Sequence, residues 1–255
     1  MNNPNEIAIG FADLGVQKAT MPKYRAFLLA VMAGVFISMS GVAATIATSV
    51  SGKLAGALIF PAGLIMVVTA GSELFTGDSL MFVSRLERKI NAKQMISTII
   101  LVYAGNFIGS ALIALLATYS GALAPYAEAV VATAAAKASL PLHEAILRGV
   151  LCNILVCLAI WIAAASDNVT GKVFGLYFPI VMFVLCGFEH CVANMYYLPA
   201  GAIASIRYDI PAPELTLFNA VFRNMIPVTF GNMLGGMSIG LIYWAAYLKR
   251  KKKKA

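Results

Sequence analysis

Ionisable side chains interrupt two of the long apolar runs of the sequence. Glu73 interrupts the run at residues 54–83, and Glu189 with His190 interrupts the run at residues 173–195. Ionisable groups at membrane depth are costly to keep and usually mark ion or proton pathways. An imidazole can gain or lose a proton near neutral pH, so this pattern favours a site that handles protons or small ions.

A metal centre is an alternative chemistry for the second of these runs. Cys186, His190 and Cys191 could supply thiolate and imidazole ligands, which suit zinc or copper. His190 and Cys191 are adjacent, however, and His143 is the only other histidine, so a complete ligand set is missing. We therefore expect no metal, no cofactor and no enzymatic activity.

The apolar runs define the elements that must hold these side chains. The chain of 255 residues is 60% hydrophobic and 12% charged, and runs of about 20 apolar residues can cross a bilayer as helices. We predict a single all-α transmembrane channel domain over residues 1–255. Its six spanning helices are expected at residues 26–50, 54–83, 95–116, 145–165, 173–195 and 228–248, the last with a prelude from Leu215.

The two ends of the chain differ from its apolar middle. Residues 1–21 are expected to form an amphipathic helix with Ile7, Phe11 and Leu14 on one face. Residues 249–255 form a basic tail that directly follows an apolar run.

The distribution of basic residues predicts the orientation. Fourteen of the nineteen Lys and Arg residues fall on one side of a six-span arrangement. Because cytoplasmic segments carry an excess of Lys and Arg, we expect a multi-pass protein of the cell inner membrane with both termini in the cytoplasm. The tail supplies much of the net charge of +8, and there it suits anionic lipid headgroups rather than nucleic acid.

The two halves of the sequence contain matching motifs in the same order. Gly-Ser-Glu-Leu at residues 71–74 resembles Gly-Phe-Glu-His at residues 187–190, and Gly-Asn-x-x-Gly occurs at residues 105–109 and 231–235. A repeated unit of three spans must enter the membrane from opposite sides. We therefore predict a 3+3 inverted repeat with interrupted second and fifth helices, an architecture in which substrate sites lie near the membrane midplane.

The Gly-Asn-x-x-Gly motifs have a structural role in this interpretation. Glycines at i and i+4 allow two helices to approach closely. We expect the motif asparagines, Asn106 and Asn232, to hydrogen-bond the interrupted segments.

Three segments taken together resemble the signature sequences of the formate–nitrite transporter family. They are GSELFTG at residues 71–77, LCNILVCLA at residues 151–159 and GFEHCVANM at residues 187–195. The resemblance covers nearly the whole chain, and the motifs are long and jointly specific. It implies an aquaporin-like protomer in a homopentamer, each protomer with its own pore for a small monovalent anion such as formate, nitrite or hydrosulfide.

The resemblance also implies polar residues along the substrate pathway. The central histidine of the family matches His190, with Glu189 and Asn194 as its neighbours in sequence. The asparagine near that histidine matches Asn153. The pore-vestibule lysine of the family matches Lys137.

Further residues are implied as the loop and the constrictions of the pore. The broken loop of the second span corresponds to Leu74, Phe75 and Thr76. The apolar constrictions match Phe60 and Leu74 on one side and Phe183 on the other. Without the resemblance, these phenylalanine and leucine side chains would be interpreted as core packing.

The physical chemistry of a small anion suits these residue types. A bare anion in a low-dielectric passage costs of order 20 kcal/mol in solvation, whereas protonating an acid of pKa near 4 at pH 7 costs roughly 4 kcal/mol. We therefore expect passage as the neutral acid, with transient protonation at His190. Lys137 would attract the anion, and the Thr76 hydroxyl would donate to its oxygen.

A neutral-solute or water channel of aquaporin type is the alternative, because two broken helices in an inverted repeat fit it as well. The sequence has no Asn-Pro-Ala pair, and its interrupted runs carry carboxylates. Glycerol or water permeability without anion flux would favour this alternative. The segment at residues 71–77 suits nitrite and hydrosulfide as well as formate, so the sequence does not select one anion.

Overall fold

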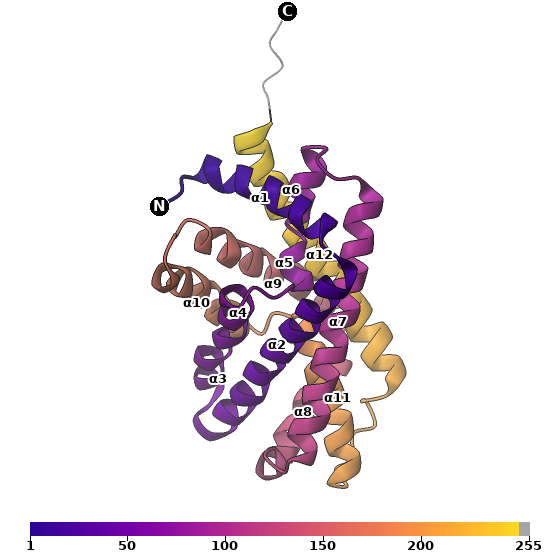
Figure 1. Ribbon diagram of the computed structural model, residues 1–255. Helices are drawn as coiled ribbons and strands as arrows, with labels where there is room; N and C mark the ends of the chain where they lie inside the picture. Colours follow the sequence, from indigo (N-terminus) through magenta and orange to yellow (C-terminus); the bar gives the residue numbers. More distant parts are fainter. Residues whose placement is uncertain (250–255) are drawn as a thin grey trace, which may run out of the picture.

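The computed structural model describes residues 1–249 of the chain. Over these residues the protein is helical and contains no β-strand (Figure 1). The basic tail expected at residues 249–255 lies outside the described residues except for Lys249.

The helices are named in chain order. The α-helices are α1 (Pro4–Thr20), α2 (Lys23–Ser51), α3 (Lys53–Ile59), α4 (Pro61–Thr69), α5 (Phe75–Asp78), α6 (Met81–Leu86), α7 (Ala92–Tyr119), α8 (Ala127–Ala138), α9 (Leu142–Ala163), α10 (Val169–Cys186), α11 (Cys191–Arg207) and α12 (Ile226–Tyr243). Three short segments have another helical pitch: η1 (Ala124–Tyr126), η2 (Asn219–Met225) and η3 (Trp244–Leu248).

Several helices are long and apolar enough to cross a membrane. Within the described residues five segments meet this condition, namely α2, α7, α9, α10 and the run from η2 through α12 to η3. They correspond to five of the six predicted spans. The run predicted as the second span consists instead of α3, α4, α5 and α6, with non-helical residues 70–74 between α4 and α5.

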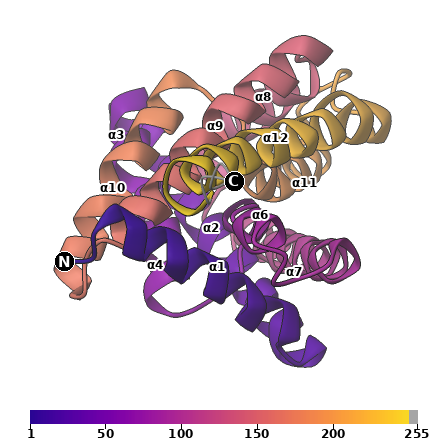
Figure 2. The ribbon, with the colours of Figure 1, turned by 90° about the horizontal axis from the view of Figure 1, so that it is seen from above.

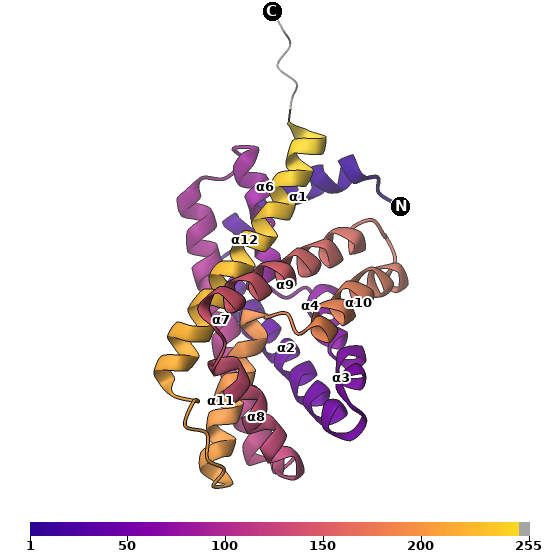
Figure 3. The same ribbon diagram turned by 180° about the vertical axis from the view of Figure 1, so that it is seen from behind.

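The apolar runs do not predict α8 or the greater part of α11. The fifth predicted span ends at residue 195, whereas α11 continues to Arg207. Both helices are rich in alanine and other small residues, so their apolar signal is weaker than that of α9 or α10. They pack against each other, and α11 also packs along α7 (Figure 3).

Helix α1 lies across one end of the bundle, beside α6 and η3 (Figure 2). A capping box begins it, because Asn3 accepts from the N–H of Glu6 at 3.0 Å and Glu6 accepts from the N–H of Asn3 at 2.8 Å. The Ser84 hydroxyl of α6 contacts the carbonyls of Phe11 and Ala12 at 3.1 and 2.8 Å. These bonds hold α1 against the bundle.

The buried face of α1 differs in one residue from the expected face. Ile7 and Phe11 are buried as predicted, but Leu14 is 38% exposed. The small residues Ala8, Ala12 and Gly15 complete the buried face. Small residues lie there because α1 sits so close to α6 that a Cβ on Gly15 would collide with Ser84, and a leucine would not fit.

Close helix pairs build the centre of the fold. Helix α2 packs along α7, and α9 packs along α12. A Cβ on Gly109 of α7 would meet the carbonyl of Val31, and a Cβ on Gly235 of α12 would meet the carbonyl of Val150. The close approach predicted from the two Gly-Asn-x-x-Gly motifs is therefore confirmed.

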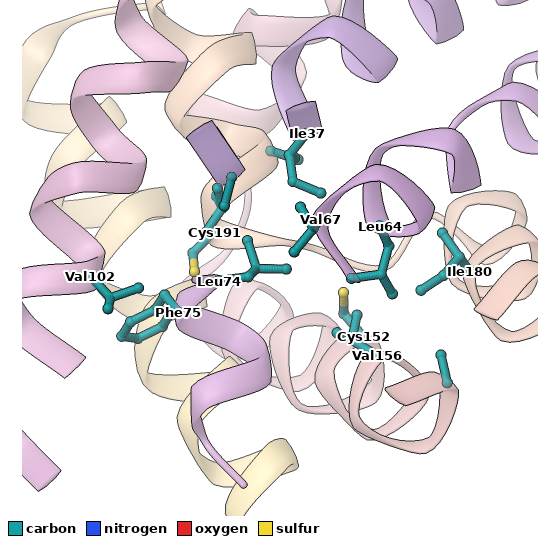
Figure 4. Close-up of a cluster of buried hydrophobic side chains, with 14 of the residues drawn as sticks. Ile37, Leu64, Val67, Leu74, Phe75, Val102, Cys152, Val156, Ile180 and Cys191 are labelled. Carbon is teal, nitrogen blue, oxygen red and sulfur yellow. The ribbon is translucent and has the colours of Figure 1, made fainter. Parts of the chain in front are cut away.

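The largest apolar cluster surrounds residues 74 and 75 and draws on most of the central helices. Leu74 lies near the middle of the labelled side chains in Figure 4. Val67 of α4, Val102 of α7 and Cys191 of α11 belong to the same cluster. The non-helical segment between α4 and α5 therefore ends inside the packed core.

Candidate functional site

The chain between α4 and α5 is held by main-chain and asparagine hydrogen bonds. The N–H of Glu73 donates to the carbonyl of Leu29 in α2 at 3.3 Å. Asn106 of α7 accepts from the N–H of Phe75 at 2.9 Å and donates to the carbonyl of Glu73 at 2.9 Å. These bonds satisfy buried peptide groups that lack partners within a helix.

The chain between α10 and α11 is held in the same way. Residues 187–190 are not helical, and the N–H of Glu189 donates to the carbonyl of Arg148 in α9 at 3.2 Å. Asn232 of α12 accepts from the N–H of Cys191 at 2.9 Å and donates to the carbonyl of Glu189 at 2.9 Å. The expected hydrogen bonds of both motif asparagines to these segments are confirmed.

The two non-helical segments bring Thr76 and His190 together. The Thr76 hydroxyl lies 3.0 Å from His190 Nε2, and the two side chains are 0% and 3% exposed. The N–H of Ala193, in the first turn of α11, donates to His190 Nδ1 at 3.1 Å. Because Nδ1 accepts, the neutral imidazole carries its hydrogen on Nε2 and donates to Thr76. The threonine hydrogen is then available to another acceptor.

Apolar rings flank this polar pair. The Phe183 ring stacks beside the His190 ring with centroids 5.9 Å apart. Phe60 meets Phe183 edge-on at 5.7 Å. Phe60, Phe183 and Leu74 are all buried, so the imidazole lies among side chains that offer an anion no hydrogen bond.

Lys137 of α8 forms a buried ion pair beside His190. Its Nζ lies 2.8 Å from Glu189 Oε1, and it also lies over the Tyr197 ring. Asn194 donates to Glu189 Oε2 at 2.7 Å and to Asn224 at 2.6 Å. These bonds, with one from Asn224 to Glu189 Oε2 at 3.3 Å, leave both carboxylate oxygens of Glu189 partnered.

Asn153 of α9 lies on the other side of Thr76. Its amide donates to the carbonyl of Thr76 at 3.1 Å, to Ser79 at 3.2 Å and to the carbonyl of Asn232 at 2.7 Å. It makes no hydrogen bond to His190 among the described residues. Asn153 therefore positions the start of α5, which carries Thr76.

A second ion-pair cluster lies where α1 crosses the non-helical segment. Lys18 Nζ contacts the carboxylate of Glu73 and lies 2.8 Å from Asp78 Oδ1. Burial alone would lower the pKa of Lys18, but the charges of Asp78 and Glu73 outweigh burial and hold that pKa above its usual value. Lys18 is therefore a permanent cation at neutral pH.

Two cavities are lined by residues of, or next to, the Thr76–His190 pair. A cavity of about 240 Å³, here called the α1-side cavity, is lined among others by Lys18, Glu73, Leu74 and Asp78. A cavity of about 200 Å³, here called the Lys137-side cavity, is lined among others by Phe60, Lys137, Phe183 and His190. Thr76 belongs to the same short segment as Leu74 and contacts His190, so the pair lies between the two cavities.

The structure also contains polar residues that the sequence analysis does not single out. Asn224 of η2 donates to the carbonyl of Lys137 at 3.0 Å and completes the Glu189 network. Asp78 and Lys18 form the cluster in the α1-side cavity. The sequence does contain a signal for Asp78, because this residue is a carboxylate inside the same apolar run as Glu73.

Comparison with known proteins supplies the family. Residues 5–245 match the sequence model of the family described as formate/nitrite transporter. The formate channel FocA of Escherichia coli (strain K12) is 37% identical over 93% of this chain and 91% of that protein. The formate channel FocA of Haemophilus influenzae is 38% identical over 86% of this chain and 85% of that protein.

Solved structures give the same result. A pentameric formate channel with formate bound has a TM-score of 0.79 and 34% identity, over 89% of this chain and 98% of that chain. An ion channel of the FNT family has a TM-score of 0.84 and 28% identity, over 95% of this chain and 98% of that chain. The apolar helices and these matches define a multi-pass membrane transport protein. The chain belongs to the formate/nitrite transporter family, whose members are channels and transporters rather than enzymes.

Proposed function

We propose that this chain forms a channel for formate, with nitrite and hydrosulfide as close analogues. The observation that carries the proposal is the buried Thr76–His190 pair, 3.0 Å apart, between two cavities. Two FocA relatives and one structural neighbour are named as formate channels, which makes formate the first candidate. Among the described residues, Lys137 is the cation that lines its cavity, and it draws the anion toward the pair.

The apolar side chains around the pair favour passage as the neutral acid. Phe60, Phe183 and Leu74 cannot replace the hydration of an anion, whose transfer to such a medium costs of order 20 kcal/mol. Protonation of an acid with pKa near 4 costs roughly 4 kcal/mol at pH 7. Protonation is therefore the easier route past these three side chains.

The proposed proton partner is His190, by transient protonation. Since Nε2 already carries a hydrogen, the second proton enters at Nδ1 and breaks the bond from the Ala193 N–H. The imidazolium then passes its Nε2 proton to Thr76, while the Thr76 hydroxyl proton passes to the anion. The products are a neutral acid and a neutral imidazole with its hydrogen on Nδ1, so the step conserves charge and leaves Nε2 free to accept a proton back from Thr76.

The symmetry of the hydrogen bonds supports a 3+3 inverted repeat with interrupted second and fifth helices. Asn106 and Asn232 each accept the N–H of the first residue of the helix that follows a non-helical segment and donate to the carbonyl two residues earlier. The N–H groups of Glu73 and Glu189 also find equivalent partners, on α2 and α9. In this aquaporin-like arrangement the Thr76–His190 pair lies near the membrane midplane.

We further propose a homopentamer in the inner membrane, with α1 and both termini on the cytoplasmic side. The structural neighbour described as pentameric supports the assembly. Large apolar side chains exposed on α7, such as Ile100 and Phe107, offer surface for lipid or a second protomer. The excess of Lys and Arg at the α1 end supports the orientation.

Flux measurements on liposomes that contain the purified protein test the proposal. We expect rapid formate uptake by the wild type and glycerol permeability no greater than that of empty liposomes. His190→Phe and Lys137→Ala should each slow formate uptake. Unchanged uptake in both variants would show the site assignment to be wrong, and glycerol uptake without formate uptake would favour a neutral-solute channel. Competition by nitrite and by hydrosulfide at two pH values would rank the anions.

A further inference from the structure

The α1-side cavity contains a charge arrangement that the proposed transport step at His190 does not use. One ammonium, that of Lys18, faces two carboxylates, those of Glu73 and Asp78. The lysine side chain is 16% exposed and the carboxylate side chains 8% and 1%. An excess negative charge in so buried a place repels an incoming anion and is itself costly. The arrangement therefore needs an explanation beyond simple ion pairing.

The two oxygens of Asp78 differ in their surroundings. Oδ1 contacts Lys18 Nζ at 2.8 Å, whereas Oδ2 is buried and makes no hydrogen bond with any described residue. Asp78 lines the α1-side cavity together with Leu74. A buried carboxylate oxygen without a partner calls for an explanation, and a role in proton transfer is one of those open to it. A molecule that has passed Leu74 would arrive beside Asp78.

A molecule that passes Leu74 as a neutral acid must lose its proton on this side. His190 does not line this cavity, so a proton released there needs an acceptor among the residues that do. We propose that Asp78 Oδ2 is the proton acceptor for the permeating acid in the α1-side cavity. This role rests on the proposed transport of a neutral acid.

The transfer balances within the cavity. The O–H bond of the acid breaks, an O–H bond forms at Asp78 Oδ2, and the acid becomes an anion. The negative charge moves from Asp78 to the new anion, so the total charge of the cavity is unchanged. The anion replaces Asp78 as an ionic partner of Lys18. Asp78 then releases its proton to the aqueous side after the anion leaves. The reverse sequence loads an acid in the opposite direction.

The groups that face this step can be named for each helix that packs on α5. Helix α1 contributes Lys18, and the segment before α5 contributes Glu73. Helix α9 contributes Cys157, whose thiol contacts the carbonyl of Thr76 at 3.5 Å. Helix α7 contributes Tyr103 against Phe75, helix α11 contributes His190 against Thr76, and α12 carries no charged residue. Glu73 lines the same cavity and contacts Lys18, and Asp78 is the carboxylate whose second oxygen is buried without a hydrogen-bond partner among the described residues.

A simpler role for Asp78 would be to dock α1 through Lys18. The two roles predict different behaviour in Asp78→Asn and Lys18→Met. Both variants break the contact between Lys18 and Asp78, but only the first removes the proposed acceptor oxygen. A mobile buffer such as phosphate can replace a missing proton acceptor, whereas it cannot replace a docking contact.

Formate flux in liposomes at low and high phosphate concentration separates the two roles. Asp78→Asn should slow flux about a hundredfold at low phosphate, the lower range for loss of a positioned proton acceptor. Flux in that variant should rise with phosphate, while flux in the wild type and in Lys18→Met should not depend on it. Wild-type flux in Asp78→Asn, or slow flux that ignores phosphate, would overturn the proposal.

Infrared difference spectra of the unmutated protein test whether Asp78 takes up a proton, without measuring flux. When formate is added, we expect a C=O band from a protonated aspartate carboxyl group. Labelling the aspartate carboxyl groups with a heavy carbon isotope should shift this band. The other three aspartates, Asp13, Asp167 and Asp209, are exposed, so the shift identifies Asp78. Absence of a label-sensitive band would overturn the proposal even if formate flux is observed. If wild-type flux is absent, the proposed function fails, and the infrared band still decides whether Asp78 takes a proton.

Discussion

The Thr76 hydroxyl and His190 Nε2 lie 3.0 Å apart, although 114 residues separate them in the sequence. The contact joins the N-terminal turn of α5 to the residue that precedes α11. Since Nδ1 of the imidazole accepts from a main-chain N–H, the Thr76 hydrogen is directed away from the ring. A substrate oxygen beside this pair would therefore meet a hydroxyl donor whose orientation is set by His190.

Replacing Thr76 by valine tests this donor. Thr76→Val keeps the shape of the side chain but removes the hydroxyl, so we expect formate flux to fall about tenfold to a hundredfold, the equivalent of one hydrogen bond to a charged group. Thr76→Ser retains the hydroxyl and should keep most of the flux. Equal flux in the valine and serine variants would exclude a role for the hydroxyl.

The effects of Lys137 on stability and on transport should be separable by a second substitution at Glu189. Lys137→Met leaves Glu189 as a buried charge without its cation, and loss of one partner of a buried pair costs about 3–5 kcal/mol. Adding Glu189→Gln removes that charge and should restore much of the thermal stability in detergent. The double variant should still show a raised KM for formate, because the attracting cation is gone. Recovery of the wild-type KM would contradict the role of Lys137.

Leu74 should control which anions pass. Leu74→Ala removes most of a side chain that lines the α1-side cavity, so we expect uptake of larger carboxylates such as lactate to increase relative to formate. Leu64→Ala is a matched control, because Leu64 is equally buried but lines neither cavity. Both changes should cost about 2–5 kcal/mol of stability. A similar loss of selectivity in both variants would indicate a general loosening of the core.

Lys18 should stabilise the docking of α1 across the neutral pH range. Its pKa is raised in the folded protein, so its contribution is fully present below the ordinary lysine pKa of about 10.4 and is lost only as pH rises through the higher folded value. Hydrogen exchange of residues 4–20 should therefore show equal protection by this contact at pH 8 and pH 9. Lys18→Met should reduce protection at both values. Protection in the wild type that falls between these pH values would contradict this assignment.

Much of the helical framework can be predicted from the sequence because it depends on local pattern. Long apolar runs give α2, α7, α9 and α10 directly. The spacing in the Gly-Asn-x-x-Gly motifs also predicts both the close helix packing and the hydrogen bonds of Asn106 and Asn232. These features need only residues that are near one another in sequence, or a motif that occurs twice.

The polar clusters are harder to predict because they depend on long-range contacts. Asn224 meets the main chain of Lys137 across 87 residues, and Lys18 meets Asp78 across 60 residues. Lys18 contributes to the sequence analysis only as one of many basic residues. Leu14 is more exposed than Ile7 and Phe11 for a related reason, since the tight contact of α1 with Ser84 selects small residues for the buried face.

Parallel measurement of formate uptake and internal pH in the same liposomes tests the central claim most directly. If His190 and Thr76 pass the substrate as a neutral acid, each formate should enter with one proton, and an imposed membrane potential should not change the rate. His190→Asn should reduce formate uptake and the acidification of the liposome interior together. Formate uptake that follows the membrane potential without acidifying the interior would show that the bare anion crosses, and would contradict the account.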